Sequence, residues 1–236
     1  MTDPREELLD DALRQRMLSY YDRRAPEYDE AYTRGTGTSS IARPEVFITE
    51  AMTLGEVVGR TAAGRLLDLA CGTGYWFPHY ARQCSIVTMF DQSAGMLAQA
   101  RQRTEAFAGA PSCVFVQGDL FEDRFEPGSH DFALVGFLLS HLTPAQEGRV
   151  FQVLKRVLDT SGRFLILESA WTATRARYNR KVERQARSLD DGTRFEIYKR
   201  YIDGEDVERW AAEQDADLQM EFLGDAFCAV SGCFRR

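Results

Sequence analysis

Short apolar runs alternate with segments of helical spacing between residues 65 and 168, and this alternation constrains the fold more than any other feature. It is typical of strand and helix units whose strands lie parallel in one sheet. The strands are predicted at RLLDLA, IVTMFD, CVFVQGD, DFALVGF and GRFLILES. The intervening helices are predicted over residues 76–82, 93–107 and 143–158. Ser93 and Thr143 suit helix N-caps. We therefore expect an α/β fold with a mostly parallel sheet.

The segments on either side of this region are predicted to cover the sheet. Residues 1–60, which have helical spacing on both sides of the sequence TRGTGTSS, are expected to form an N-terminal helical cap. Residues 61–236 are expected to form the main domain, with residues 170–200 contributing to the cover of a substrate. Within this tail the patterns predict, in order, a charged helix, a strand, a helix and a strand or hairpin, at residues 171–189, 193–202, 203–214 and 218–234.

Composition and charge exclude several functional classes. The formal net charge of -7 and the pI of about 5.1 argue against binding to nucleic acid, which calls for a clustered basic face. The five cysteines form an odd set without a CxxC pair, so neither a disulfide framework nor a metal site is expected. No apolar run approaches the roughly 18 residues that span a bilayer. We expect a cytoplasmic monomer or homodimer without a membrane partner.

The sequence LLDLACGTGYW, which starts at Leu66, places two glycines directly after the first predicted strand. In an open parallel sheet, ligands bind beyond the carboxyl ends of the strands, and the first strand-to-helix turn lines that crevice. Gly72 and Gly74 allow a ligand to approach the main chain closely. The alternative is a tight turn that serves packing alone.

Acidic residues after successive strands indicate what this turn binds. Asp91 ends the second predicted strand about 20 residues later, where a carboxylate can accept hydrogen bonds from both ribose hydroxyls. Phe77 stands where a dinucleotide fingerprint has its third glycine, so no provision for a pyrophosphate is seen. Asp68 would repel a phosphate and attract an ammonium group. Asp119 is placed to read an adenine edge or, alternatively, to cap a turn. S-adenosyl-L-methionine contains both a ribose and an ammonium group.

These motifs together resemble the class I S-adenosylmethionine-dependent methyltransferases, whose fold is a Rossmann-like, seven-stranded, mostly parallel sheet. The resemblance rests on LDLACGTGYW, FDQSAGMLAQAR, GDLFE and DFALVGFLLSHL, over residues 65–170. YYDRRAPEYDEAY and DGTRFEIYKRYID further resemble a bacterial subgroup that modifies small molecules. The resemblance implies S-adenosyl-L-methionine as cofactor, S-adenosyl-L-homocysteine as product, and cofactor contacts from Tyr21, Tyr28, Asp68, Ala70, Gly72, Gly74, Asp91, Gln92, Met96, Asp119, Leu120, Gly136 and Phe137.

Candidate catalytic residues are fewer, because a sulfonium cofactor already contains its leaving group. His141 follows the fourth strand and is the best placed base for an acceptor that holds a proton, although a capping or packing role is equally compatible. Glu168 ends the fifth strand, where it would orient a substrate or remain a solvated strand end. Tyr21 would close over the reacting groups. The residues predicted to bind substrate are His141, Glu168, Tyr178, Arg194 and Tyr198.

The sequence leaves the acceptor and two alternative functions open. The fourth strand lacks the Asn-Pro-Pro-Tyr or Asp-Pro-Pro-Tyr type of ending that the family uses on nucleobase amines, which, with the acidic balance, favours a small metabolite over DNA or RNA. The aromatic residues of the covering segments, Phe137, Tyr178, Phe195 and Tyr198, favour an apolar or aromatic acceptor, methylated at an oxygen, nitrogen or carbon atom. One alternative is an NAD-dependent oxidoreductase, which also combines a glycine turn with an acid. The other is a non-catalytic protein that binds S-adenosylmethionine, in which the cofactor motifs would be the same.

Overall fold

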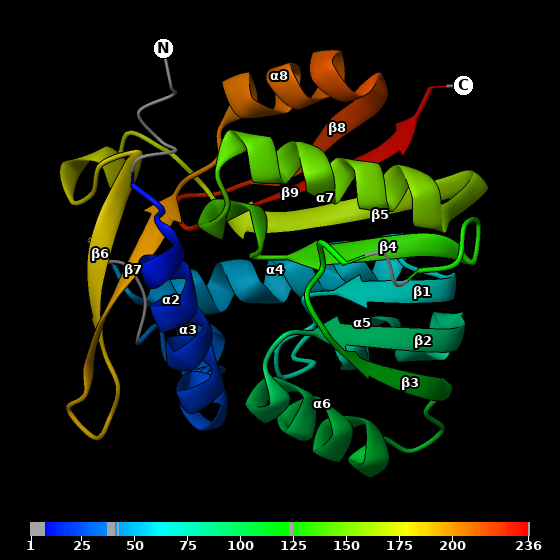
Figure 1. The fold of residues 1–236 in the computed structure, drawn as a ribbon, viewed down its shortest axis with the longest axis horizontal. Coiled ribbons are helices and arrows are strands. Elements are labelled where there is room, and N and C mark those ends of the chain that lie inside the picture. Colours follow the sequence, from blue (N-terminus) through cyan, green and yellow to red (C-terminus); the bar gives the residue numbers. More distant parts are fainter. Residues whose placement is uncertain (1–7, 37–40, 42, 123–124, 236) are drawn as a thin grey trace.

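A seven-stranded sheet forms the centre of the computed structural model, which describes residues 8–36, 41, 43–122 and 125–235 (Figure 1). The strand order is β3-β2-β1-β4-β5-β9-β8. The first five strands in this order are parallel, and β9 is antiparallel to both β5 and β8. The bounds are β1 Gly64–Leu69, β2 Cys84–Asp91, β3 Ser112–Gln117, β4 His130–Gly136, β5 Leu158–Ser169, β8 Ala216–Leu223 and β9 Phe227–Phe234. The predicted seven-stranded, mostly parallel sheet is confirmed.

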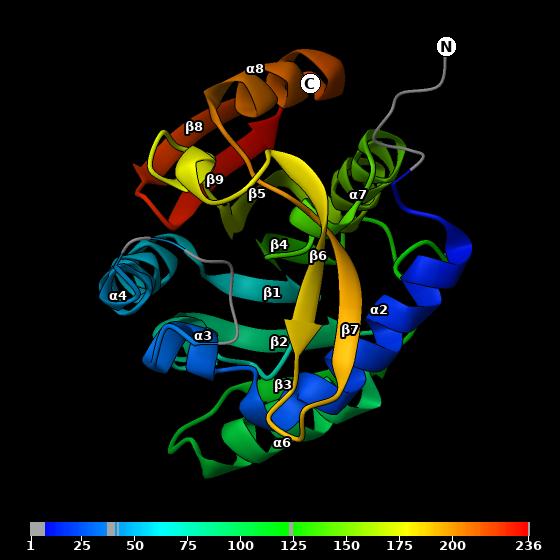
Figure 2. The same cartoon turned by 90° about the vertical axis from the view of Figure 1, so that its left-hand side faces the viewer.

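The N-terminal helices lie across the ends to which the parallel strands point. These are α2 (Asp11–Arg24) and α3 (Glu30–Thr33), with a 3-10 turn at Ala25–Glu27 between them. A two-stranded antiparallel ribbon, β6 (Val182–Ser188) and β7 (Arg194–Arg200), lies beside them at the same end (Figures 1 and 2). Leu13, Met17 and Tyr20 of α2 form an apolar cluster with Ile197 and Tyr198 of β7. The two parts therefore form one cover over the strand ends.

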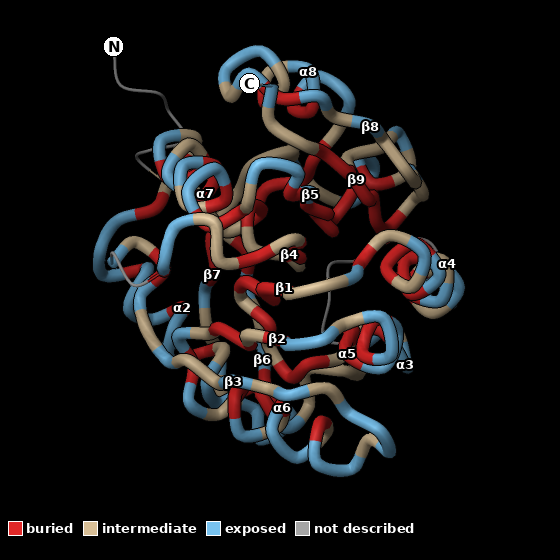
Figure 3. Tube along the Cα trace, turned by 90° about the vertical axis from the view of Figure 1, so that its right-hand side faces the viewer, coloured by how far each residue is buried: buried red, intermediate tan, exposed pale blue. Residues whose placement is uncertain are grey.

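Two buried layers hold the helices against the sheet. The helices α4 (Glu45–Thr61), α5 (Phe77–Tyr80) and α6 (Ala94–Ala106) pack on one face, and α7 (Pro144–Val157) and α8 (Gly204–Gln214) pack on the other. Because both faces are covered, β1 reads as a nearly continuous apolar run, and the central strands are buried inside exposed helices (Figure 3). Although α4 falls within the predicted cap of residues 1–60, it packs on the sheet. The predicted domain boundaries remain a prediction.

The helices of the main domain begin where their capping residues predict. The Ser93 hydroxyl accepts a hydrogen bond from the Met96 amide at 3.0 Å, and the Gln146 side-chain oxygen accepts one from the Thr143 amide at 3.0 Å. The predicted helix at residues 76–82 is present as α5 followed by a 3-10 turn at Ala81–Gln83.

One element of the tail differs in type from its prediction. The segment 171–189 was expected to be a charged helix, but it contains only a 3-10 turn at Arg175–Arg177 followed by strand β6. The prediction is wrong because pairing with β7 and packing against α2 decide the backbone here, in place of local helix propensity. β7, α8 and the β8–β9 hairpin are confirmed. No helix in the described part of the chain is both long and apolar enough to cross a membrane.

Candidate active site

The turns that follow β1 and β4 have unusual backbone conformations at the covered end of the sheet. Ala70 has a φ of 59° and Phe137 a φ of 54°, although neither is a glycine. Such strain is retained where the surrounding structure enforces it, and it is frequent at ligand sites. Gly72, with a φ of 54°, lies opposite the ring of Tyr28. Both turns are thus shaped to bring main-chain groups close to a ligand.

Asp91 holds the glycine turn in place. Its carboxylate oxygens accept hydrogen bonds from the amides of Gly72 and Ser93, each at 2.9 Å. Burial raises the pKa of this carboxyl, and the hydrogen bonds from Ser93 and Gly72 oppose the shift. Asp91 therefore links the turn after β1 with the start of α6.

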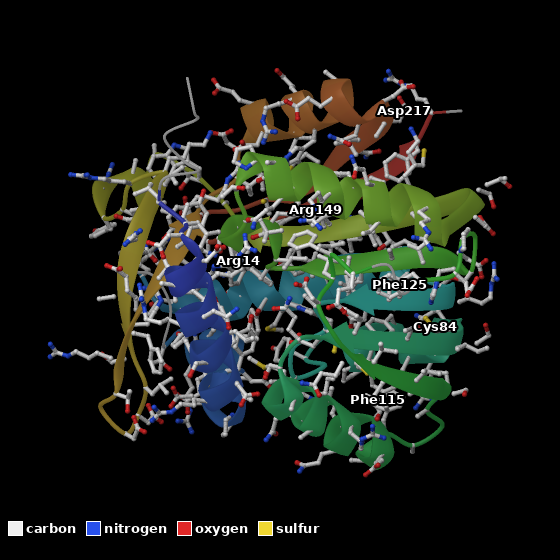
Figure 4. The ribbon with its side chains drawn as sticks, viewed as in Figure 1. Arg14, Cys84, Phe115, Phe125, Arg149 and Asp217 are labelled. Atoms are coloured by element: carbon white, nitrogen blue, oxygen red, sulfur yellow. The ribbon has the colours of Figure 1, made fainter. Side chains whose placement is uncertain are left out.

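A large cavity of about 180 Å³ lies between these turns and α2. We call it the large cavity. Arg14, labelled on α2 in Figure 4, and Leu18 line its outer part. It brings together most of the residues predicted to bind cofactor, namely Tyr21, Tyr28, Ala70, Gly72, Asp91, Gln92, Met96, Asp119, Leu120, Gly136 and Phe137.

Asp68 and Gly74 are predicted cofactor residues that do not line the large cavity. Asp68 is buried within the sheet, and its carboxylate accepts a hydrogen bond from the Tyr80 hydroxyl at 2.6 Å. Burial raises the pKa of Asp68 to about 7. A side chain at Gly74 would meet Met89 and Ala100, so this glycine allows close packing of the turn on β2 and α6.

Two carboxylates attach the cap to the turns beneath it. Asp22 of α2 accepts hydrogen bonds from the Ser93 hydroxyl at 2.7 Å and from the Gly95 amide at 2.8 Å. Asp29 accepts one from the Thr73 hydroxyl at 2.5 Å and pairs with Arg103. The cap is therefore joined directly to the residues that shape the large cavity.

Tyr21 and His141 meet at the inner end of the large cavity. The Tyr21 hydroxyl lies 2.8 Å from Nε2 of His141, and Nδ1 of the same ring lies 2.9 Å from the Tyr198 carbonyl oxygen. Because a carbonyl oxygen only accepts, Nδ1 carries the proton and Nε2 accepts from Tyr21. Burial, followed by the positive charge of Lys199, holds the pKa of His141 well below its usual value. The imidazole is therefore neutral at neutral pH.

Glu168 is buried at the end of β5, and the large cavity's lining does not include it. Its carboxylate accepts hydrogen bonds from the amides of Ser140 at 3.0 Å and Ser169 at 3.2 Å. Burial raises its pKa, and the charge of Lys199 opposes that shift. The side chain thus fixes the backbone after β4 and β5, which differs from the solvated strand end considered as its alternative.

Comparison with known proteins identifies the central region. Residues 66–162 match a family model described as a methyltransferase domain. The central region of the chain is therefore similar to a methyltransferase domain. Over 113 residues it is 32% identical to a demethylmenaquinone methyltransferase of Beutenbergia cavernae, covering 48% of this chain and 44% of that protein. It is 30% identical to the demethylmenaquinone methyltransferase of Clavibacter sepedonicus over 60% of this chain and 55% of that protein. The chain spans about half the length of these curated relatives.

Solved structures extend the likeness beyond the methyltransferase domain. A structure described as a DhpI-SAM-HEP complex has a TM-score of 0.74 and 21% identity, covering 95% of this chain and 99% of that one. The glycopeptide N-methyltransferase MtfA has a TM-score of 0.54 and 17% identity, covering 77% of this chain and 90% of that one. These likenesses establish the class I methyltransferase fold, including the Rossmann-like sheet.

A second, smaller cavity adjoins the large one at the edge of the methyltransferase domain. It measures about 50 Å³, and we call it the small cavity. Tyr21, Tyr28, Phe137 and His141 line both cavities. The rest of its lining comes mostly from the cover and consists of Arg24, Ala31, Tyr32, Ser169, Arg187, Ile197, Lys199 and Phe227. Three of these residues are basic.

Like Glu168, three further residues predicted to bind substrate do not line this small cavity. Tyr178 and Arg194 are exposed, and neither lines the large cavity. Tyr198 is fully buried and contributes its carbonyl oxygen to His141. Arg194 and Tyr198 lie on β7, which contributes to the small cavity, but on the face opposite to the residues that line it. Because side chains alternate along a strand, Ile197 and Lys199 point the other way from Tyr198.

Sequence reasoning missed the basic residues of the small cavity. Arg187 lies in the segment that was predicted as a charged helix, so its place in the cavity was not expected. Lys199 gave a usable signal, since it lies in the apolar pattern of the predicted strand, where a solvated lysine is not expected. Arg24 ends a charged helix whose sequence gives no sign that this one arginine is buried.

Proposed function

We propose that this chain is an S-adenosyl-L-methionine-dependent methyltransferase that moves a methyl group to an oxygen, nitrogen or carbon atom of a small molecule. The observation that supports this most is the convergence of Asp91, the glycine turn and the backbone after β4 on one large cavity inside a matched methyltransferase domain. The family match favours this reading over the NAD-dependent oxidoreductase.

The residues of the large cavity fit the cofactor's chemical groups. Asp91 provides a carboxylate for ribose hydroxyls. Met96, Leu120 and Leu142 provide an apolar setting for an adenine, with Asp119 beside it. Gly72 and Gly136 provide backbone without a side chain for the methionine portion. Bound there, S-adenosyl-L-methionine would supply a methyl group on a sulfonium.

The protein's own contribution is to position the acceptor and exclude water. Tyr21 and Tyr28 of the cap cover the junction of the two cavities, and both residues are half-buried there. His141 keeps its proton on Nδ1 and presents Nε2 to Tyr21, so the Tyr21 oxygen has lone pairs that can accept a hydrogen bond from an acceptor. The pair is thereby placed to hold a proton that leaves the acceptor.

The acceptor is proposed to be a small molecule with an apolar or aromatic part. Phe137 and Phe227 lie beside the junction, with ring centroids 5.1 Å apart. Tyr32 packs against both. The curated relatives are named for quinone precursors, which supports a small ring compound as the acceptor. We propose no nucleic-acid or membrane partner, and the cytoplasmic location remains a prediction.

Calorimetric titration with S-adenosylhomocysteine, run beside NAD, tests the cofactor. Wild-type protein is expected to bind S-adenosylhomocysteine and not NAD. Asp91→Ala should weaken this binding at least tenfold, or about 1.4 kcal/mol, because the ribose contact is lost. Asp217→Ala, on the exposed edge strand β8, is the control. Binding of NAD alone would refute the proposal.

Transfer itself is tested with methyl-labelled S-adenosylmethionine and a panel of small hydroxyl, amine and carbon acceptors. Label in an organic product is expected for at least one acceptor. Tight cofactor binding with no transfer to any of them would favour the non-catalytic alternative.

A further inference from the structure

Three basic side chains from separate elements converge on the small cavity. Arg24 ends α2, Arg187 lies on β6 and Lys199 lies on β7. No aspartate or glutamate is among the described residues that line it. A chain with a formal charge of -7 thus gathers three basic side chains at one small cavity.

Arg24 is the most informative of the three. It is only 7% exposed, and its guanidinium donates a hydrogen bond to the Tyr20 hydroxyl at 2.6 Å while lying over the rings of Tyr20 and Tyr28. Within the described part of the chain, no carboxylate lies within ion-pair distance of Arg24. Burying a cation without a counter-charge is costly. An anion at this point would supply the missing partner.

Lys199 is likewise buried, at 6% exposed, and its Nζ donates to the Ser140 hydroxyl at 2.8 Å. Burial lowers its pKa to about 7; the nearby Glu168 carboxylate opposes this shift, whereas the charges of Arg187, Arg175 and Arg24 add to it. Glu168 therefore offsets only part of the effect of burial and of the neighbouring positive charges on Lys199. An additional negative charge would favour the ammonium form.

The position of the small cavity separates it from the cofactor's proposed contacts. The residues that line both cavities are those at their junction, whereas Ala70, Gly72 and Asp91 line the large cavity alone. By volume the small cavity has room for roughly four water molecules, which is the scale of a compact charged group.

We propose that the small cavity binds an oxyanionic group, a carboxylate or a phosphoryl group, of the methyl acceptor. Arg24 and Arg187 have planar guanidinium groups suited to paired oxygens, and Lys199 adds a point charge. This inference rests on the proposed methyltransferase function. It places the anionic end of the acceptor among these cations and its reactive atom toward Tyr21 and His141.

The test uses Lys199→Met and Arg187→Gln, because Arg24 is packed too deeply to replace safely. Arg184→Gln is the matched control: it removes the same charge from the same strand, but its guanidinium lies on the other face and bonds to the Leu8 carbonyl and Asp10. Thermal melting of all variants confirms that they are folded.

Inorganic phosphate and benzoate are titrated into protein saturated with S-adenosylhomocysteine. At least one should bind wild type and the control, and both test variants should weaken that binding tenfold or more. S-adenosylhomocysteine affinity should change less than twofold. In the transfer assay, 4-hydroxybenzoate is compared with 4-hydroxybenzamide, and glycerol 3-phosphate with glycerol. The acid of at least one pair should be preferred, which also distinguishes a carboxylate from a phosphoryl group.

Three results would overturn this inference alone, given that S-adenosylhomocysteine binds wild type. They are the failure of both anions to bind, equal binding to wild type and test variants, or an equal loss of S-adenosylhomocysteine binding, which would assign the cations to the cofactor's own carboxylate. Failure of S-adenosylhomocysteine to bind wild type would instead reject the proposed function.

Discussion

Burial decides which single residues are charged around the sheet ends. Asp68 and Lys199, of opposite type, are both brought to a pKa of about 7 chiefly by burial. His141 is held neutral for the same reason. In contrast, the Arg65 guanidinium lowers the pKa of the less buried Asp131 to about 2. Asp68 and Lys199 therefore titrate near neutral pH, whereas Asp131 does not.

Asp68 should make the stability of the protein depend on pH between about 4 and 7. In this range the folded protein keeps a proton on Asp68 that the unfolded chain, with a pKa of 3.8, has released. The contribution of Asp68 to the free energy of unfolding therefore falls as pH rises, by at most about 1.4 kcal/mol per pH unit. Asp68→Asn should remove this dependence and gain in stability relative to wild type toward pH 7. Urea unfolding at pH 5, 6 and 7 measures it.

The matched control for this experiment is Asp217→Asn, at an exposed position on β8 labelled in Figure 4. It should follow the wild-type pH dependence. If Asp68→Asn also follows the wild-type curve, then Asp68 is ionised in the folded state and the assignment of its raised pKa is wrong.

At the scale of elements, polar side chains fix how neighbouring segments meet. Glu50 of α4 accepts hydrogen bonds from three successive backbone amides in the turn between β8 and β9, those of Asp225, Ala226 and Phe227 at 2.8, 2.9 and 2.9 Å. Gly224 is needed beside it, since a Cβ there would lie 2.3 Å from the carboxylate. The helix thus positions the turn next to Phe227, which lines the small cavity.

Glu50→Ala should lower the free energy of unfolding by about 2 kcal/mol, because three amides lose their charged acceptor. Glu56→Ala, at an exposed position of the same helix, should change it by less than about 0.5 kcal/mol. Urea unfolding of the two variants measures the difference. Equal values would show that water replaces the carboxylate without cost.

The elements also show which parts of the fold and of the site could be predicted from the sequence alone. The parallel strands and their helices were predictable because both faces of the sheet are covered, which produces continuous apolar runs between capped helices. Gly72, Asp91 and Asp119 were predictable because they follow the strand ends, whereas the other predicted residues of the large cavity depended on the resemblance to methyltransferase motifs. β6 was not, since its charged sequence becomes a strand only through pairing with β7. The small cavity was therefore missed, as its residues come together from segments that lie far apart in the sequence.

At the scale of the whole molecule, the large cavity joins the cap to the sheet. Tyr21 and Met17 line it from α2, and Gly72 and Gly136 line it from the turns after β1 and β4. A ligand held between these two parts should stabilise their contact, since it would contact both of them at once. The cap is already attached through Asp22 and Asp29. Binding of a ligand should therefore stabilise both the cap and the turns after β1 and β4.

Hydrogen exchange with and without S-adenosylhomocysteine tests this coupling. Saturating ligand should slow amide exchange severalfold in α2 and in the turn at residues 70–74, because both lose access to open states. Exchange in α8 should stay unchanged, since none of its residues, all of which the structure describes, lines either cavity. Protection of the turn without protection of α2 would mean that the ligand binds the sheet alone. The cap would then have no part in holding the cofactor, and Tyr21 would be left with a role toward the acceptor only.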